Sequence, residues 1–366
     1  MAYYVGIMSG TSLDGVDIAI VDIKDDADCT VISATTFDFP SSLHLLLQRL
    51  VNDSYCHLKN FGELDVALGQ FIGHAINTQL SQSDITPDDI VAIGSHGHTV
   101  YHCPDGDLPF SLQIGNANVI AEITQITTVA DFRQRDIAAL GQGAPLVPAF
   151  HQALFSTPER TNVILNIGGI ANVTVLNPEQ AVIGFDTGPG NGLMDAWIYR
   201  HLGQTYDQDG NWAASGQVND VLLMQMLADP YFSQTIPKST GREYFNLLWL
   251  ENQLTQLGEN VDVVDVQSTL NALTAFSIAN SVKQYHPQTI YICGGGVHND
   301  QLTQAIASQL DNVVVSSTAE LGLDPDWVEA AAFAWLAYCT MNKKTGNLPS
   351  VTGAKHAVIL GSIHPA

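Results

Sequence analysis

The stretch M-S-G-T-S-L-D-G-V-D, residues Met8–Asp17, places a small-residue turn between two runs with strand character. It combines two glycines with hydroxyl side chains and two carboxylates. Small residues let backbone N–H groups approach a ligand closely, and carboxylates hold cations or accept protons. The stretch therefore predicts a ligand-binding turn between two strands.

A layout of three strands around a glycine turn occurs twice in the sequence. The predicted strands are residues 3–8, 16–23 and 30–39 in the first half and residues 162–167, 172–176 and 181–185 in the second. The short connections favour an antiparallel meander at the start of each half. This recurrence predicts an α/β protein made of two duplicated lobes, with the ligand cleft between them.

The boundary between the lobes is expected within residues 130–160, where the chain has no Pro-rich linker. We place it so that the N-terminal lobe is residues 1–135 and the C-terminal lobe is residues 136–366. A helix is predicted at residues 326–338. The sequence leaves open whether this last helix packs back on the first lobe.

Composition limits the partners. The 366 residues include 37 acidic and 13 basic side chains, a formal net charge of −24, which repels nucleic acid and anionic lipid. A polyphosphate ligand would need local compensation from backbone amides, a few arginines or a divalent cation. The five cysteines are scattered, so free thiols are expected. Without a leader segment or a long apolar run, we expect a soluble cytoplasmic protein that binds no membrane.

Three glycine turns directly follow predicted strands, at Gly10–Gly15, Gly168–Gly169 and Gly294–Gly296. The sequence has no G-x-x-x-x-G-K-[ST] motif and no G-x-G-x-x-G motif after the first strand, so P-loop and dinucleotide folds are disfavoured. A single glycine turn usually does no more than reverse the chain. Three of them in a duplicated framework favour phosphate binding.

Ten motifs along the chain resemble those of the anhydro-N-acetylmuramic acid kinase family. In order from Gly6 to Ala337 they are GIMSGTSLDGVD, GSHGHTVYH, QIGNANVIA, ADFRQRD, GQGAPLVP, NIGGIANVT, GFDTGPGNGLMD, KSTGREYFN, CGGGVHN and GLDPDWVEAAAFAWLA. That family belongs with sugar kinases, heat-shock ATPases and actin. The resemblance implies two duplicated actin-like, ribonuclease-H-like lobes with a nucleotide cleft between them. It also implies that ATP, with Mg²⁺, opens and phosphorylates 1,6-anhydro-N-acetylmuramic acid, giving N-acetylmuramic acid 6-phosphate and ADP in cell-wall recycling.

The resemblance assigns the glycine turns to the nucleotide. The first phosphate loop would comprise Gly10, Thr11, Ser12, Leu13, Asp14, Gly15, Val16 and Asp17. The second would comprise Asn166, Gly168 and Gly169, and the adenosine loop Gly294, Gly295 and Gly296. Many superfamily members carry an aspartate in the first strand, where this chain has Met8. Metal coordination must therefore fall elsewhere, and the choice between Asp14 and Asp17 stays open.

Asp186 follows a predicted strand and precedes the glycine-rich turn Gly188-Pro189-Gly190. A carboxylate at that position either projects from a rigid element toward a ligand or caps the helix expected near Asn191. The sequence does not choose between these roles. The family resemblance makes Asp186 the catalytic base.

The resemblance assigns four further residues to the sugar: Thr99, Arg133, Arg135 and Glu329. Either arginine could bind the lactyl carboxylate of the muramic acid by a bidentate fork, and a salt bridge with a neighbouring aspartate is the structural alternative. For Glu329, the alternative is a first-turn glutamate that complements its helix dipole.

Three histidines, His96, His98 and His102, stand beside Cys103 and could indicate a metal site. Histidines in a Gly/Thr-rich loop more often form a polar wall, and the resemblance assigns this segment to the sugar. Metal ligands therefore stay unassigned.

Two other functions share parts of this pattern. A conventional sugar kinase would phosphorylate a free hydroxyl, and an actin-like ATPase would switch a protein partner. The expected partners are an amino sugar and ATP, and a homodimer is left open.

Overall fold

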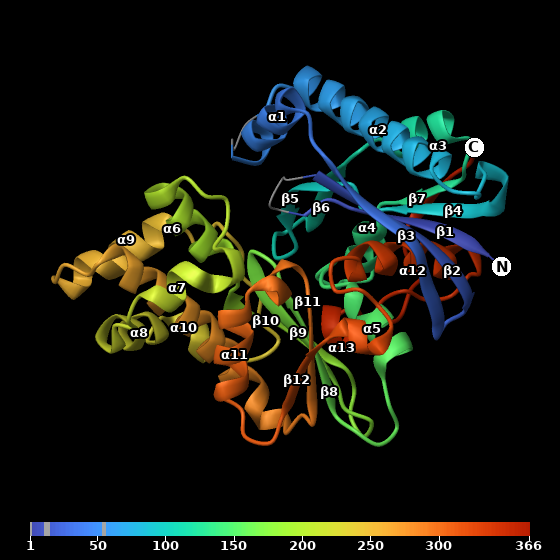
Figure 1. Ribbon diagram of the computed structural model, residues 1–366. Coiled ribbons are helices and arrows are strands. Elements are labelled where there is room, and N and C mark those ends of the chain that lie inside the picture. Colours follow the sequence, from blue (N-terminus) through green and yellow to red (C-terminus); the bar gives the residue numbers. More distant parts are fainter. Residues whose placement is uncertain (1, 11–14, 53–55) are drawn as a thin grey trace. The chain divides into compact units, whose positions relative to one another are not determined.

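The computed structural model describes residues 2–10, 15–52 and 56–366, which form two compact units (Figure 1). Unit 1 comprises Met1–Leu154 and Trp327–Ala366, and unit 2 comprises Phe155–Asp326. The division after Leu154 lies within the expected range of residues 130–160 but beyond the limit that we placed between residues 135 and 136. Asp136 explains part of the difference, because its buried carboxylate accepts hydrogen bonds from Asn347 (2.6 Å) and Thr352 (2.8 Å) within unit 1.

Unit 1 is built on a six-stranded sheet with the order β13-β7-β4-β1-β2-β3. Its strands are β1 (Tyr3–Met8), β2 (Gly15–Asp25), β3 (Asp28–Asp38), β4 (Ile90–Ser95), β7 (Thr128–Ala130) and β13 (Ser362–His364). Strands β1, β2 and β3 run antiparallel as the expected meander, whereas β1, β4 and β7 run parallel. A separate hairpin joins β5 (His98–Cys103) and β6 (Phe110–Ile114).

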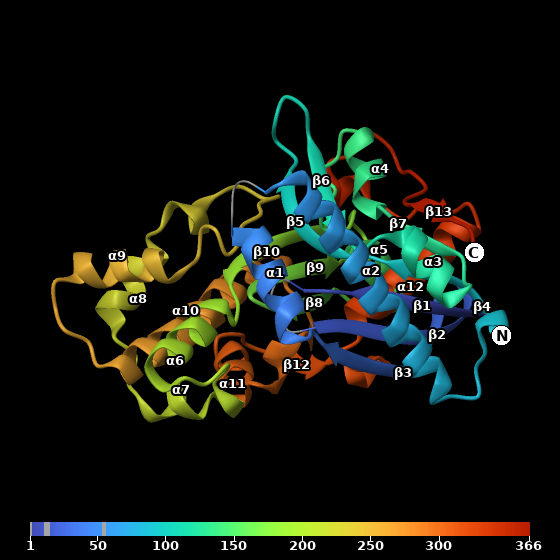
Figure 2. The same ribbon diagram turned by 90° about the horizontal axis from the view of Figure 1, so that it is seen from above.

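Helices cover both faces of this sheet. They are α1 (Ser41–Asn52), α2 (Leu58–Ser81), α3 (Ala117–Thr124), α4 (Phe132–Ala138), α5 (Val147–Phe155), α12 (Val328–Met341) and α13 (Pro349–Thr352). Figure 2 shows α2 and α3 lying together over the sheet, where Val5 and Ile7 of β1 share a core with Leu68 and Ile72 of α2. Side chains alternate along a strand, so Gly6 faces the other way, toward α12.

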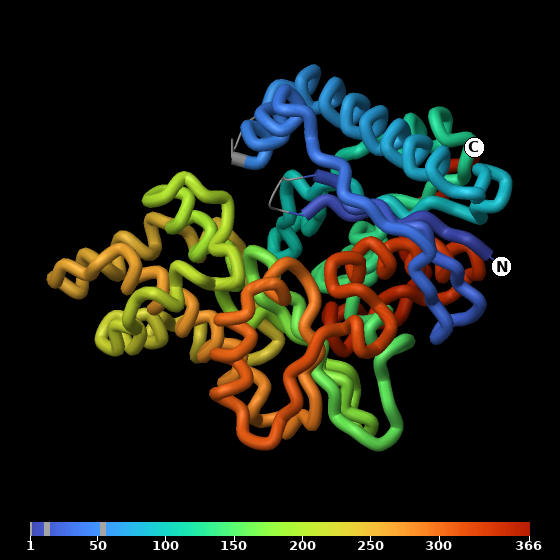
Figure 3. The backbone as a smooth tube through the Cα atoms, viewed as in Figure 1, coloured from blue at the N-terminus to red at the C-terminus, as the bar shows by residue number. Residues whose placement is uncertain are grey.

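The last long helix packs back on the first strands. Figure 3 shows α12, red in the tube, beside the blue N-terminal strands, although more than 300 residues separate Gly6 from Ala330 in the chain. A Cβ atom on Gly6 would overlap the carbonyl oxygen of Ala330, and one on Gly94 would overlap that of Phe333. Glycines in the strands and alanines in the helix therefore let the two backbones meet, which answers the question the sequence left open.

Unit 2 repeats the sheet of unit 1. Its order is β10-β9-β8-β11-β12, with β8, β9 and β10 antiparallel and β8, β11 and β12 parallel. The strands are β8 (Asn162–Ile167), β9 (Ile170–Leu176), β10 (Ile183–Pro189), β11 (Thr289–Cys293) and β12 (Val314–Ser317). Strand order and strand directions match β3-β2-β1-β4-β7, so the predicted internal duplication is confirmed.

The helices of unit 2 pack around a core that includes Phe185, Trp197, Leu270 and Ile292. They are α6 (Gly192–Leu202), α7 (Asn211–Ser215), α8 (Asp220–Leu227), α9 (Leu247–Leu257), α10 (Val263–Val282) and α11 (Asp300–Ser308). Short 3₁₀ turns lie at Pro87–Asp89, Gln208–Gly210, Pro230–Ser233, Lys283–Tyr285, Gly295–His298 and Thr318–Leu321. Over the described ranges, none of the helices has the length and apolar character needed to cross a membrane.

Candidate active site

The second and third glycine turns meet at one edge of the unit 2 sheet. They follow β8 and β11, which are neighbouring parallel strands whose carboxyl ends lie at the same edge. A Cβ on Gly294, whose φ is +76°, would overlap Oδ1 of Asn166, and one on Gly296 would overlap the side chain of Ile167. The structure thus brings Asn166 and Gly294–Gly296 together, as expected of two loops that share a ligand.

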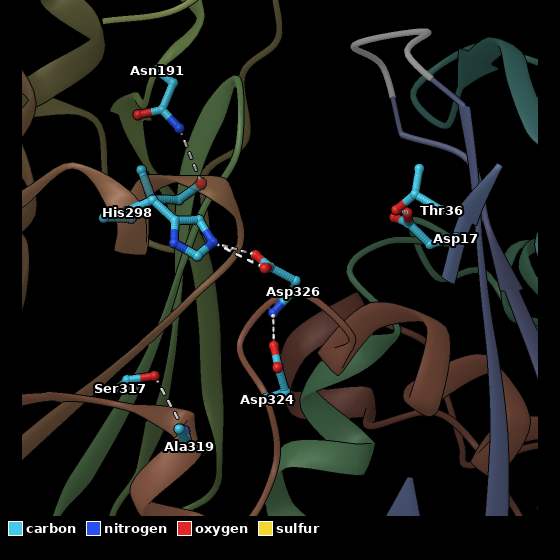
Figure 4. Close-up of polar contacts among 9 residues, drawn as sticks. Asp17, Thr36, Asn191, His298, Ser317, Ala319, Asp324 and Asp326 are labelled. Carbon is cyan, nitrogen blue, oxygen red and sulfur yellow. Dashed lines mark hydrogen bonds and ion pairs between the residues drawn. The ribbon is translucent and has the colours of Figure 1, made fainter. Parts of the chain in front are cut away.

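The Gly168–Gly169 turn is fastened by the segment that follows β10. The carbonyl of Gly169 accepts the N–H of Gly190 at 3.0 Å, and that of Gly168 accepts the N–H of Asn191 at 2.8 Å. The Asn191 amide also reaches back to the carbonyl of Ile167 at 3.4 Å (Figure 4). The turn is therefore held rigidly at the end of β8.

The Gly294–Gly296 turn is anchored at its other end. The N–H of Gly294 donates to the carbonyl of Pro325 at 2.9 Å, and Nε2 of His298 lies 2.9 Å from both carboxylate oxygens of Asp326 (Figure 4). Gly295 is less crowded, because the nearest atom to its Cβ position is Nδ2 of Asn191, at 4.0 Å. This loop offers an open glycine between two tightly packed ones.

Asp186 lies at a β-bulge. The pairing of β10 with β9 shifts between Asp186 and Gly188, and Gly188 has a φ of +146°. A bulge redirects side chains relative to a regular strand. The capping alternative is excluded, because α6 begins at Gly192 after Asn191, and the carboxylate of Asp186 instead accepts the backbone N–H of Thr240 at 2.9 Å.

Two residues that sequence reasoning did not find hold the backbone of Asp186. The hydroxyl of Tyr231 donates to its carbonyl at 2.7 Å, and its N–H donates to the carbonyl of Lys238 at 3.0 Å. Tyr231 and Thr240 lie 45 and 54 residues beyond Asp186, so no local pattern could have indicated them. The motif K-S-T-G-R-E-Y-F-N, residues 238–246, contains Lys238 and Thr240 but carries no sign of their contact with Asp186.

Burial raises the pKa of Asp186 to about 6. The N–H of Thr240 opposes this shift by stabilising the carboxylate, the nearby Glu243 adds to it, and the charge of Lys238 opposes it. A carboxylate whose pKa lies near neutrality can take a proton during turnover and release it afterwards. Asp186 therefore has an acidity that suits general-base catalysis.

In unit 1, Arg133 is fixed by His96. Its Nε and Nη2 lie 3.1 and 2.9 Å from Nε2 of His96, and its Nη1 donates to the carbonyl of Gly143 at 2.8 Å. Burial, followed by the charge of Arg133, holds the pKa of His96 well below its usual value. The neutral ring donates through Nδ1 to the carbonyl of Gly97 at 2.9 Å, so Nε2 accepts from the arginine.

Glu329 belongs to the same group. It lies in the first turn of α12, and its charge acts to raise the pKa of Arg133, although burial prevails and lowers that pKa to about 10. The structure thus brings together two of the four expected sugar residues. Arg135, on α4, is exposed.

Thr99 lies on the β5–β6 hairpin, where its hydroxyl accepts from Nε2 of Gln113 at 3.1 Å. Gln113 and His96 also line a cavity of about 240 Å³ at the carboxyl ends of β4 and β7. His98 and His102 pair through Nδ1 with Ser9 (3.1 Å) and Ser111 (2.9 Å). In the part of the chain that the structure describes, no cluster of three or more His, Cys, Asp or Glu side chains could hold a metal ion.

The segment expected to form the first phosphate loop, residues 10–17, is described only at its two ends. Thr11, Ser12, Leu13 and Asp14 lie outside the described residues. Gly15 packs closely on β3, since a Cβ there would overlap the carbonyl of Phe37, and Val16 is fully buried in the core. Asp17 accepts the hydroxyl of Thr36 on β3 at 2.7 Å (Figure 4). Of these described side chains, only that of Asp17 is a carboxylate suited to a cation.

The paired sheets define a duplicated ribonuclease-H-like fold, the class of the sugar kinases and actin-like ATPases. Sequence comparison then gives the family. The model of anhydro-N-acetylmuramic acid kinase matches residues 2–366. The chain belongs to this family and is a phosphotransferase that uses ATP.

Known relatives are similar in sequence to this chain over nearly its full length. The chain is 49% identical over 372 residues to the anhydro-N-acetylmuramic acid kinase of Photobacterium profundum, covering 99% of this chain and 98% of the relative. It is 48% identical over 375 residues to the enzyme of the same name from Haemophilus influenzae, with 99% and 98% covered. A solved activator of 2-hydroxyisocaproyl-CoA dehydratase from Clostridium difficile, with bound ADPNP, is 14% identical with a TM-score of 0.45, covering 92% of this chain and 94% of that one.

Proposed function

We propose that this kinase uses ATP to open 1,6-anhydro-N-acetylmuramic acid, with Asp186 as the base that activates water. The products are N-acetylmuramic acid 6-phosphate and ADP, formed in cell-wall recycling. The observation that carries the proposal is the partly buried Asp186 carboxylate, held at the bulge by Thr240 with a pKa of about 6.

The substrate dictates the chemistry. Its O6 is locked in the bridge to C1, so there is no free hydroxyl at C6 for an ordinary kinase to phosphorylate. The oxygen of water bonds to C1 while its proton passes to Asp186. The C1–O6 bond breaks with its electron pair on O6. O6 then bonds to the γ-phosphorus of ATP as ADP leaves. The first half resembles inverting glycoside hydrolysis, and phosphoryl transfer takes the place of the usual general acid.

The residues of unit 1 are assigned to the sugar. We assign the lactyl carboxylate to Arg133 rather than Arg135, because the half-buried guanidinium of Arg133 is fixed by His96 and Gly143. A fixed planar fork loses little entropy when it binds a carboxylate. Glu329 and Thr99 are assigned to sugar hydroxyls.

The glycine turns of unit 2 fit a nucleotide. Gly295 leaves room for a close ligand, and the rigid Gly168–Gly169 turn lies at the adjacent strand end. ATP supplies the phosphoryl group and brings Mg²⁺ on its phosphates. Asp17 or Asp14 would complete the coordination of that ion.

The test is Asp186→Asn, with Asp220→Asn as a matched control on the exposed first turn of α8. Because asparagine keeps the size but cannot accept the proton, turnover should fall about 10²- to 10⁴-fold while both substrates still bind. The control should keep wild-type turnover. Near-normal turnover of the Asp186 variant would reject the assignment.

The same assay separates the rival functions. Sugar-dependent ADP release from the anhydro sugar, with little from free N-acetylmuramic acid, is the expected result. Equal use of the free sugar would favour a conventional sugar kinase. ADP release that ignores both sugars would favour an ATPase that switches a protein partner.

A further inference from the structure

Arg242 lies directly against the second phosphate loop. A Cβ atom on Gly169 would stand 2.7 Å from both Nε and Nη2 of Arg242 and 3.1 Å from its Cζ. Such distances are too short for real contacts, so any side chain at position 169 would displace the guanidinium. Glycine at this position therefore leaves the space that the guanidinium of Arg242 occupies.

The segment around Arg242 is well anchored. The N–H of Thr240, two residues before it, holds the carboxylate of Asp186 at 2.9 Å. Phe245, three residues after it, is buried in the unit 2 core, and its N–H donates to the carbonyl of Gly241 at 3.1 Å. The guanidinium and the proposed base are thus positioned by one short stretch of chain.

Unit 2 has few cations that could serve an anion at this place. Its Lys and Arg residues, all within the described ranges, are Arg160, Arg200, Lys238, Arg242 and Lys283. Arg200 lies in the last turn of α6, where it forms an exposed ion pair with Glu251 at 2.6 Å, and Nζ of Lys238 lies over the ring of Tyr231, 4.4 Å from its centre. Arg160 precedes β8, at the opposite edge of the sheet, and Lys283 follows α10. The chain carries a net charge of −24, so a local cation is needed for a polyphosphate.

We propose that Arg242 binds the oxygens of the phosphoryl group that is transferred, above the Gly168–Gly169 turn. This inference rests on the proposed function, because it takes that turn as the second phosphate loop. A planar guanidinium with several donors matches phosphate oxygens and can neutralise the charge that builds up during transfer. Arg242 therefore acts on the phosphoryl group while Asp186 acts on water.

The first test is nucleotide binding by calorimetry with Arg242→Gln, without sugar. Loss of a charge-assisted hydrogen bond should weaken the non-hydrolysable ATP analogue AMPPNP about 10- to 150-fold and ADP much less. Arg200→Gln is the matched control, since its exposed ion pair contributes little to stability, and it should bind both nucleotides normally. Unchanged AMPPNP affinity in a folded Arg242→Gln variant would overturn the proposal.

A double-mutant cycle tests the contact itself. If Gly169→Ala acts by displacing the guanidinium, it should weaken AMPPNP as Arg242→Gln does, and the double variant should be no worse than either single one. Fully additive losses would contradict the contact. A raised KM for the muramic sugar with unchanged nucleotide affinity would make Arg242 a carboxylate-binding residue instead. Turnover of the anhydro sugar by the wild-type enzyme tests the proposed function separately, because the calorimetric measurements of nucleotide binding require no reaction.

Discussion

At the scale of single residues, Asp186 shows what sequence can and cannot determine. Its place after a strand and before glycines was visible, and so was the choice between base and cap. The contacts that it makes instead of a helix cap, with Tyr231 and Thr240, come from distant positions in the chain. Because the shift in its pKa follows from burial in the fold, it could not be predicted from neighbouring residues.

The pH dependence of turnover follows from that pKa. Asp186 must be ionised to accept a proton, so kcat measured at saturating substrates should fall as the pH drops through about 6. The loss should follow the ionised fraction of one carboxyl group. A kcat that stays level down to about pH 4.5 would contradict a base with this pKa.

The same shift predicts a stability change. The folded pKa of about 6 lies above the ordinary 3.8, so the folded state binds the proton more tightly. Stability from this group is present below the ordinary pKa and is lost as the pH rises through the folded one. Near neutral pH, the free energy of unfolding of Asp186→Asn, measured with urea, should therefore exceed that of the wild type by up to about 3 kcal/mol. The stability difference between the wild type and the variant should vanish near pH 3.5, where the aspartate and the asparagine are both neutral. A difference that does not change with pH would contradict this explanation.

Arg133 and Arg135 looked alike in the sequence, and burial now separates them. Arg133→Ala should raise KM for the anhydro sugar by an amount worth about 1.5–3 kcal/mol, typical of a hydrogen bond to a charged group. Arg135→Ala, at an exposed site, should change it little. The KM for an anhydro sugar that lacks the lactyl group should stay the same in both variants. Equal losses on both sugars would show that Arg133 supports the site without binding the carboxylate.

At the scale of elements, the glycine turns that follow β8 and β11 lie where they were expected, but glycine serves different purposes in them. At Gly15, Gly294 and Gly296 the space that a side chain would need is filled by the protein's own atoms. A glycine needed for close packing and a glycine needed for close approach of a ligand look the same in a sequence. The predicted strands coincide or overlap with β1, β2, β3, β8, β9 and β10, whereas the reason for each glycine required coordinates.

Helix α12 offers a test of element packing. Gly6→Ala would push a methyl group into the carbonyl oxygen of Ala330, so the variant should lose about 1–3 kcal/mol of stability in denaturant unfolding. Gly62→Ala is the matched control, because Gly62 is exposed on α2 and no atom lies within 4 Å of its Cβ position. That change should stabilise by about 0.5–1 kcal/mol. Equal unfolding midpoints for the wild type and the Gly6 variant would show that the helix has room to move.

At the scale of the whole molecule, the duplication was predictable and the domain limits were not. Each half of the sequence begins with a predicted hairpin and a glycine turn, and the two sheets repeat one strand order. The return of residues 327–366 to unit 1 depends on packing at Gly6 and Gly94, contacts with very large sequence separation. A boundary drawn from local composition could not include them.

In the proposed reaction, water adds to C1 while O6 takes the phosphoryl group. The most direct test is mass spectrometry of the product formed from anhydro sugar and ATP in ¹⁸O-enriched water. Unlabelled product incubated in the same water corrects for exchange of the anomeric oxygen. We expect ¹⁸O on C1 beyond that exchange and none between C6 and phosphorus. Label in the phosphate ester would contradict it, because O6 would then have come from water rather than from the anhydro bridge.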